Sequence, residues 1–206
     1  MHAHRTTRWE SLVDRGYGAK FADLHANGED ISGEARLADV LAPRNASILD
    51  AGSGMGRVGA ALQDRGHHVV GVDLDEALLA QSRRTFPHLP VVSARLDELA
   101  PETLAAQGHP TEYDLVVCVG NVMILLAPDS EVEVLQRLRA LLAPAGRLLV
   151  GFHLEARPES SRTYPAADFT ADARTAGLEV QARFASYDLQ PVGESDDYAV
   201  FVLRHQ

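Results

Sequence analysis

An acidic residue and three closely spaced glycines follow a short apolar run in this chain. The segment reads Ile48-Leu49-Asp50-Ala51-Gly52-Ser53-Gly54-Met55-Gly56-Arg57. An apolar run bounded by glycines predicts a buried parallel strand, and helical spacing of apolar residues resumes after Arg57. A strand, a glycine turn and a helix open a nucleotide-binding α/β unit. The chemistry indicated is therefore the binding of a cofactor that contains a nucleotide or nucleoside.

The spacing and charge of this turn separate two classes of cofactor. The dinucleotide fingerprint has glycine at the first, third and sixth positions, but here the sixth is Arg57 and the third glycine comes early, at Gly56. A pyrophosphate prefers bare amides at a helix N-terminus, and the Asp50 carboxylate would repel it. S-adenosylmethionine carries a sulfonium and an ammonium against one carboxylate. The acid at the strand end therefore favours S-adenosylmethionine.

A second acid, Asp73, closes the next apolar run, His68-Val69-Val70-Gly71-Val72-Asp73. A carboxylate at this position, about twenty residues after the glycine turn, can accept hydrogen bonds from both ribose hydroxyls. Both classes of cofactor share this feature. The alternative for Asp73 is a helix N-cap, for which Asp75 is the better candidate.

Together these segments resemble the class I S-adenosylmethionine-dependent methyltransferases, and the resemblance runs from about Leu37 onward. Further matching pieces are residues 113–118 and the turn into a strand at residues 141–150. The resemblance implies S-adenosyl-L-methionine as cofactor, S-adenosyl-L-homocysteine as product and in-line transfer of the methyl group. The cofactor-binding residues expected from these motifs are Asp50, Ala51, Gly52, Ser53, Gly54, Gly56, Arg57, Asp73 and Leu74.

Two loops beyond later strands are further candidates, because ligands of open α/β sheets bind beyond the carboxyl ends of the strands. The family commonly has an acid where Arg95 stands, contacting adenine, and the next amide, Leu96, contacts the ring. Asp97 comes two residues late, and we expect it to cap a helix. After the fourth strand, Gly120 allows a close backbone approach. Asn121 either bonds the cofactor ammonium or the acceptor, or caps a short helix.

Three isolated residues complete the candidate site. His153 follows the fifth predicted strand, where it is either a general base near the acceptor or a structural residue. Arg36, at the start of the helix before the first strand, either clamps the cofactor carboxylate or forms a surface ion pair. Tyr17 is a further candidate of the same kind. No cluster with metal-ligand spacing is present, so no metal site is predicted.

The pattern of elements predicts an α/β fold with a Rossmann-like, doubly wound, seven-stranded sheet and helices on both faces. The last two strands are too close for a crossover helix and must pair as an antiparallel C-terminal hairpin. We expect a single domain over residues 1–206, with an N-terminal helical cap at 1–41, helical from Arg8, and the core at 42–206. Strands are predicted at 47–51, 68–72, 90–94, 113–118, 147–152, 178–187 and 198–204, and helices at 56–65, 75–85, 131–142 and 166–176.

Composition limits the possible partners. A formal net charge of −10 disfavours nucleic acid, and the chain lacks a membrane-spanning run and a signal peptide, so a cytoplasmic location is expected. The single cysteine, Cys118, is expected in the core. The predicted function is methylation of a small-molecule acceptor on oxygen or nitrogen. The alternatives are an NAD(P)-dependent oxidoreductase and a non-catalytic protein that binds S-adenosylmethionine. The oligomeric state is open, and a homodimer is one state that the sequence allows.

Overall fold

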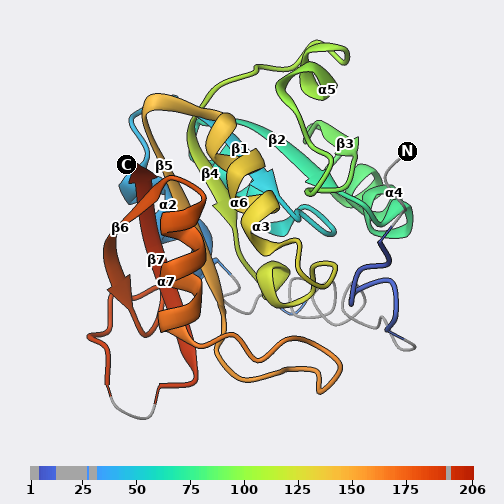
Figure 1. The fold of residues 1–206 in the computed structure, drawn as a ribbon. Coiled ribbons are helices and arrows are strands. Elements are labelled where there is room, and N and C mark those ends of the chain that lie inside the picture. The colour runs from blue at the N-terminus through green and yellow to red at the C-terminus, as the bar shows by residue number, and fades with distance from the viewer. Residues whose placement is uncertain (1–4, 13–26, 28–31, 194–195) are drawn as a thin grey trace.

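A seven-stranded mixed sheet runs through the computed structural model, which describes residues 5–12, 27, 32–193 and 196–206 (Figure 1). The strand order is β3-β2-β1-β4-β5-β7-β6. Strands β1 to β5 are parallel, and β7 is antiparallel to both β5 and β6. The predicted fold class, including the antiparallel C-terminal hairpin, is confirmed. The strands are β1 (Ser47–Ala51), β2 (His68–Asp73), β3 (Val91–Ser93), β4 (Tyr113–Cys118), β5 (Leu142–His153), β6 (Leu178–Phe184) and β7 (Tyr198–His205).

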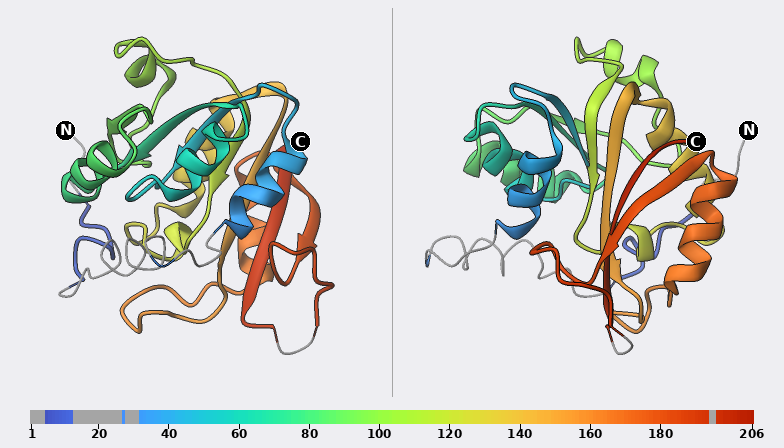
Figure 2. Two further views of the ribbon diagram at one scale, coloured as in Figure 1. Left: turned by 180° about the vertical axis from the view of Figure 1, so that it is seen from behind. Right: turned by 90° about the vertical axis from the view of Figure 1, so that its left-hand side faces the viewer.

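Helices cover both faces of the sheet (Figures 1 and 2). Helices α6 and α7 pack on one face, and α2 and α3 pack on the other. The four helices predicted after the glycine turn are confirmed within two residues at each end. The two shortest, α5 and η1, were not predicted because so few residues carry no periodic pattern. The described helices are α2 (Gly33–Leu41), α3 (Arg57–Gln63), α4 (Glu76–Thr85), α5 (Pro101–Ala105), η1 (Val122–Ile124), α6 (Glu131–Ala140) and α7 (Ala166–Thr175).

Successive residues of the central strands face opposite cores. In β1, Leu49 belongs to the core on the α6 and α7 side, whereas Ile48 belongs to the core on the α2 and α3 side. In β4, Val116 and Val117 divide in the same way. Because helices bury both faces, both sets must be apolar, which explains the continuous apolar runs in the sequence.

Strand β5 begins five residues earlier than the predicted 147–152. Leu142 already pairs with Tyr113, and the register then shifts before Arg147 pairs with Leu115. The segment Pro144-Ala145-Gly146 therefore lies in an irregularity within the strand, where the sequence indicated a turn. Strand β6 ends at Phe184, earlier than predicted.

The expected N-terminal helical cap is not helical where the structure describes its beginning. Residues Arg8–Ser11 form a turn. The backbone amides of Arg8 and Trp9 donate to the carbonyl oxygens of Leu126 and Leu125, at 3.3 and 3.1 Å, instead of to a helical partner. The helix at the end of this region is present as α2. Within the described ranges, no helix has the length and apolar composition needed to cross a membrane.

Candidate functional site

The glycine turn connects β1 to α3, and its backbone requires glycine. Gly52, Gly54 and Gly56 have positive φ angles of 82°, 55° and 86°, which side-chain-bearing residues rarely adopt. The Gly52 and Ser53 amides donate to the Val72 carbonyl at 2.8 and 3.0 Å, which ties the turn to β2. A Cβ atom on Gly52 would collide with both methyl groups of Val122. The turn therefore leaves its surface open only because this position lacks a side chain.

Asp73 ends β2 beside this turn. One carboxylate oxygen accepts from the Gly54 amide at 2.8 Å, and the other accepts from the Asp75 amide at 2.8 Å. Burial raises the pKa of Asp73, although these backbone bonds oppose the shift. Asp75, not Asp73, caps α4 through bonds from Ala77 and Leu78, as the sequence predicted. Asp73 is therefore not needed as the helix cap, and its carboxylate lies on the turn.

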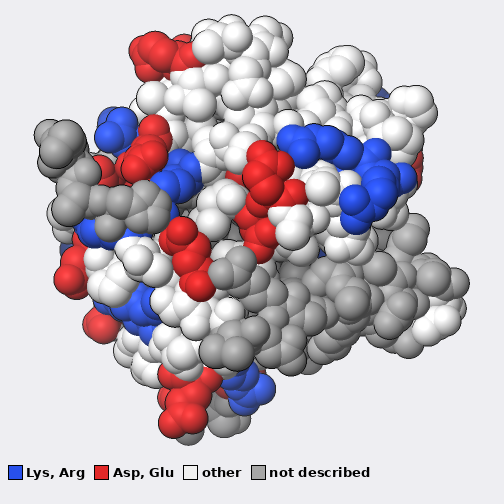
Figure 3. Space-filling view, turned by 90° about the vertical axis from the view of Figure 1, so that its right-hand side faces the viewer, with Lys and Arg blue, Asp and Glu red and all other residues white. Residues whose placement is uncertain are grey.

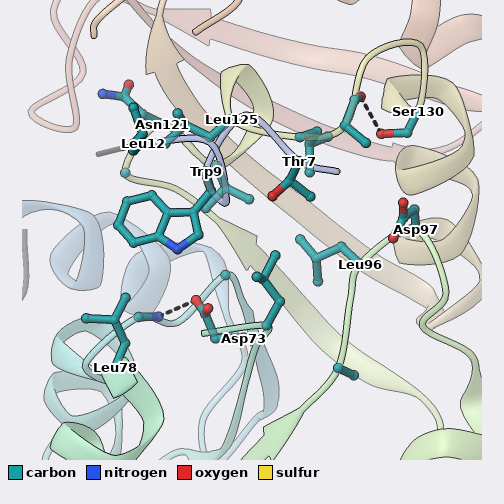
Figure 4. A pocket seen from close by; sticks show the side chains of 18 of the residues that line it. Thr7, Trp9, Leu12, Asp73, Leu78, Leu96, Asp97, Asn121, Leu125 and Ser130 are labelled. Carbon is teal, nitrogen blue, oxygen red and sulfur yellow. Dashed lines mark hydrogen bonds between the residues drawn. The ribbon is translucent and has the colours of Figure 1, made fainter. Parts of the chain in front are cut away.

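A cavity of about 350 Å³ opens beyond the carboxyl ends of the parallel strands (Figure 4). It joins the glycine turn, the end of β2, the loops after β3 and β4, and the N-terminal segment. The predicted site residues that line it are Gly52, Gly54, Asp73, Leu74, Leu96, Gly120 and Asn121. The other lining residues are Thr7, Trp9, Leu12, Leu78, Ala94, Asp97, Val122, Leu125, Leu126, Ala127, Ser130, Arg157 and Pro158.

Several of these lining residues were not predicted as site residues. Thr7, Trp9 and Leu12 come from the N-terminal segment, and Arg157 and Pro158 come from the loop after β5. Neither group carries a motif. A signal was nevertheless present for one of them, since Trp9 is the only tryptophan of the chain and stands in a polar segment.

Asp50 lies behind the glycine turn and outside this cavity. Its carboxylate is 2% exposed and accepts from the Gly59 amide at 3.0 Å, which fixes the start of α3. Together with Ser53 and Arg57 it lines a much smaller recess that also touches Gly52. Burial raises the pKa of Asp50 to about 7, and the positive charge of Arg57 opposes the rise. The buried acid thus becomes fully charged only above neutral pH or when a positive charge is nearby.

The remaining predicted residues of the turn have structural partners. Ala51 is fully buried in the core, and Gly56 packs against Ser82. Arg57 forms a two-pronged ion pair with Glu34 on α2, with distances of 2.5 and 2.8 Å, and neither side chain is more than 15% exposed. Arg57 therefore links α3 to α2 and does not line the main cavity.

The raised pKa of Asp50 predicts a pH dependence of stability. Because the pKa is near 4 when unfolded and about 7 when folded, this group makes the folded protein lose stability as pH rises from about 4 to 7. We expect Asp50→Asn to flatten this part of the profile. The measurement is the free energy of unfolding by urea between pH 4 and 8, with the exposed Asp64→Asn as control. Equal slopes in the variant and the parent protein would contradict the expectation.

The expected contact of Arg95 with the cofactor is not found, since Arg95 does not line the cavity. Its guanidinium binds both carboxylate oxygens of Asp97, at 3.0 and 2.9 Å, and also binds Glu10 at 3.1 Å and the Arg5 carbonyl at 2.7 Å. The expectation that Asp97 caps a helix is wrong, because the N-cap of α5 is Ala100. Asp97 instead lines the cavity, where Arg95 holds its carboxylate.

Asn121 and His153 lie at adjacent strand ends, but only Asn121 lines the cavity. The Asn121 side-chain oxygen accepts from the His153 amide at 2.9 Å, and it makes no bond that caps η1. The His153 ring packs edge-on against Tyr198, and its Nδ1 lies 3.8 Å from Asp197. The prediction of a general base thus concerns a ring that does not line the cavity.

Two further predicted residues have other outcomes. Arg36 forms an exposed ion pair with Asp188 at 3.4 Å and is not among the cavity residues, so the surface alternative agrees with its position. Tyr17 lies outside the described residues. In the described part of the chain, no group of three or more potential metal ligands comes together. Cys118 is buried in the core as predicted, and burial raises the pKa of its thiol.

Comparison with known proteins gives matches over most of the chain. Residues 48–146 match a family model described as a methyltransferase domain. The crystal structure of a TehB-like SAM-dependent methyltransferase from Corynebacterium glutamicum is 36% identical, and the match covers 93% of this chain and 97% of that chain with a TM-score of 0.82.

Two curated proteins match a smaller part. A ubiquinone biosynthesis O-methyltransferase of Leptothrix cholodnii is 32% identical over 99 residues, which cover 48% of this chain and 40% of that protein. A carboxy-S-adenosyl-L-methionine synthase of Pseudomonas putida is 29% identical over 133 residues, covering 61% of this chain and 53% of that protein. The chain thus spans about half the length, or less, of these curated relatives.

Proposed function

Since the chain belongs to the family of S-adenosylmethionine-dependent methyltransferases, we propose that it transfers a methyl group from this cofactor to a small-molecule acceptor. The observation that carries the proposal is the cavity of about 350 Å³, which combines the glycine turn and Asp73 with a largely apolar wall. Membership of this family sets aside the alternative of a nicotinamide-dependent oxidoreductase. The alternative of binding without methyl transfer is addressed by the experiment below.

The residues at the turn fit the cofactor in shape and charge. Each oxygen of Asp73 accepts a single printed backbone bond, so the carboxylate keeps acceptor capacity for ribose hydroxyls. The bare surface at Gly52 would be filled by a Cβ, and Asp50 supplies a negative charge behind the turn. When bound, S-adenosylmethionine supplies an electrophilic methyl group. The chain's own contribution is to orient the two reactants and exclude water, which can account for much of the rate enhancement.

The opposite part of the cavity suits the acceptor. Leu125, Leu126, Ala127 and Pro158 form an apolar wall there, with Asn121 as a neighbouring polar group. This surface fits a small, partly apolar molecule that presents an oxygen or nitrogen atom. The name of the Leptothrix cholodnii relative, an O-methyltransferase, makes oxygen the first acceptor atom to test.

The charge of the surface disfavours nucleic acid as the acceptor. The formal net charge is −10, whereas binding to nucleic acid requires clustered Lys and Arg. On the described part of the face in Figure 3, acidic and basic side chains are interspersed, and acidic ones lie near its centre. We therefore include no nucleic acid among the proposed partners.

The proposed function is tested with methyl-labelled S-adenosylmethionine. The purified protein is incubated with panels of phenols, catechols, amines and carboxylic acids, and labelled products are separated by mass. Formation of a labelled product and of S-adenosylhomocysteine, both lost in Asp73→Asn, is the expected result. Tight cofactor binding by calorimetry without any labelled product from the panels and from a metabolite extract would overturn the proposal in favour of a binding protein.

The position of His153 gives a separate prediction. A general base is worth about 10²–10⁴-fold in rate, but this ring faces Tyr198 and Asp197 rather than the cavity. We therefore expect His153→Gln to lower kcat less than about threefold, far below the range for a general base. The measurement is kcat against pH with the acceptor found above. Loss of a kinetic limb near neutral pH, with a fall of 100-fold or more, would restore the general base.

A further inference from the structure

The N-terminal segment Arg5–Leu12, here called the strap, forms one side of the cavity. Thr7, Trp9 and Leu12 of this segment line the cavity together with the end of β2 and α4 (Figure 4). The Trp9 indole donates from Nε1 to the Asp75 carboxylate at 3.0 Å, next to Asp73. The strap does not fill the cavity, because about 350 Å³ remains open beside it. It is therefore a wall of the site rather than a plug.

One end of the cavity holds the strap through the loop that leads into α6. The Arg8 and Trp9 amides bond the Leu126 and Leu125 carbonyls, both in cavity-lining residues. The Arg8 side chain bonds the Leu126 carbonyl at 3.0 Å and the largely buried Glu131 at 3.3 Å. This attachment places the strap against the apolar wall proposed for the acceptor.

The other attachment is Arg95, in the loop after β3. Its side chain is 11% exposed and binds the strap twice, at the Glu10 carboxylate (3.1 Å) and at the Arg5 carbonyl (2.7 Å). The same guanidinium holds both oxygens of Asp97, which lines the cavity. Arg95 thus connects the strap to the loop that contains Leu96 and Asp97.

The strap is shaped so that Glu10 can take this bond. The Glu10 oxygen that meets Arg95 also accepts from the Thr7 amide and the Thr7 hydroxyl, both at 2.8 Å. Burial alone would raise the pKa of Glu10, but the bonds from Thr7 and Arg95 outweigh it and the pKa is lowered. Glu10 is therefore charged at neutral pH, as an ion pair with Arg95 requires.

We propose that Arg95 is a positioning residue that fastens the strap, and that the strap, through Trp9, forms the wall against which the nucleoside of the cofactor binds. This role rests on the proposed function for the identity of the cofactor. It also explains the basic residue at a position where the sequence led us to expect an acid. Arg95 contributes to cofactor affinity by holding Trp9 and Asp97 in place, without lining the cavity itself.

Trp9 is the only tryptophan of the chain, so its fluorescence reports directly on this wall. We expect S-adenosylhomocysteine to change the emission of the parent protein and to protect Trp9 from quenching by acrylamide. Arg95→Met should raise acrylamide quenching in the protein without cofactor and weaken S-adenosylhomocysteine binding about tenfold, an effect typical of losing a charged hydrogen bond. Arg95→Lys should restore part of the affinity.

The matched control is Arg83→Met, which removes an exposed arginine paired with Glu76 on α4 and should change neither measurement. Glu10→Gln is the second variant, since it weakens the same link from the strap side. Thermal unfolding of every variant identifies any that fails to fold. Unchanged quenching and unchanged affinity in folded Arg95→Met and Glu10→Gln would overturn the proposal. The quenching measurement needs no cofactor, so it tests the strap even if the proposed function fails.

Discussion

Gly52→Ala is expected to weaken binding of S-adenosylhomocysteine by at least about 100-fold, equivalent to about 2.7 kcal/mol. The new Cβ would collide with both methyl groups of Val122, which itself lines the cavity. Val122 is β-branched and cannot fold away, so relief of the collision moves it into the space for the cofactor. The φ angle of +82° adds a backbone cost of about 1–2 kcal/mol for any side-chain-bearing residue. Calorimetry with S-adenosylhomocysteine gives the affinity, and urea unfolding gives the stability.

Gly108→Ala separates these two effects. Gly108 has nearly the same φ, +77°, but a Cβ there would meet nothing within 4 Å. This control should lose only the backbone cost, about 1 kcal/mol of stability, and keep its affinity for S-adenosylhomocysteine. If Gly52→Ala binds within threefold of the parent protein, the turn does not contact the cofactor as proposed.

Asp73→Asn is expected to weaken the same ligand about 30- to 100-fold, with a smaller effect on stability. The amide group can replace only one of the two oxygens that accept from Gly54 and Asp75, and it removes the charged acceptor for the ribose. Hydrogen bonds to charged groups contribute about 1.5–3 kcal/mol. Because burial raises the pKa of Asp73, its charge also costs the folded protein free energy, and the neutral amide avoids that cost.

Calorimetry and the rise in melting temperature caused by S-adenosylhomocysteine both test this expectation. The exposed Asp64→Asn is the control for the loss of one negative charge and should bind like the parent protein. A variant at Asp73 that unfolds readily but binds normally would show that the carboxylate only supports the turn.

The fold and the centre of the site were predictable because their signals are local. The glycine turn and the acids after β1 and β2 lie within short stretches of sequence, and the parallel topology brings their ends to one edge of the sheet. The antiparallel hairpin followed from the short connection between its strands. These inferences needed only the spacing of neighbouring residues and the rules of strand connection.

The outer wall of the site was not predictable because its contacts join distant residues. Arg95 meets the carbonyl of Arg5, which is 90 positions away, and Arg8 meets that of Leu126, which is 118 positions away. The sequence pattern indicates only that an acid is missing at Arg95. It cannot indicate that Arg95 holds Asp97 on the cavity wall, nor that the ring of His153 turns toward Tyr198.

The order of the last strands affects how the sheet can be completed. Strand β7 follows β6 in the chain but lies between β5 and β6. During synthesis, β6 therefore has no edge to join until Tyr198–His205 has emerged, and β5 waits with unpaired backbone groups. Such an open edge is a template for pairing with other chains. A nascent chain halted before Tyr198 is therefore exposed to aggregation, and the chaperones that attend synthesis would meet this protein at that stage.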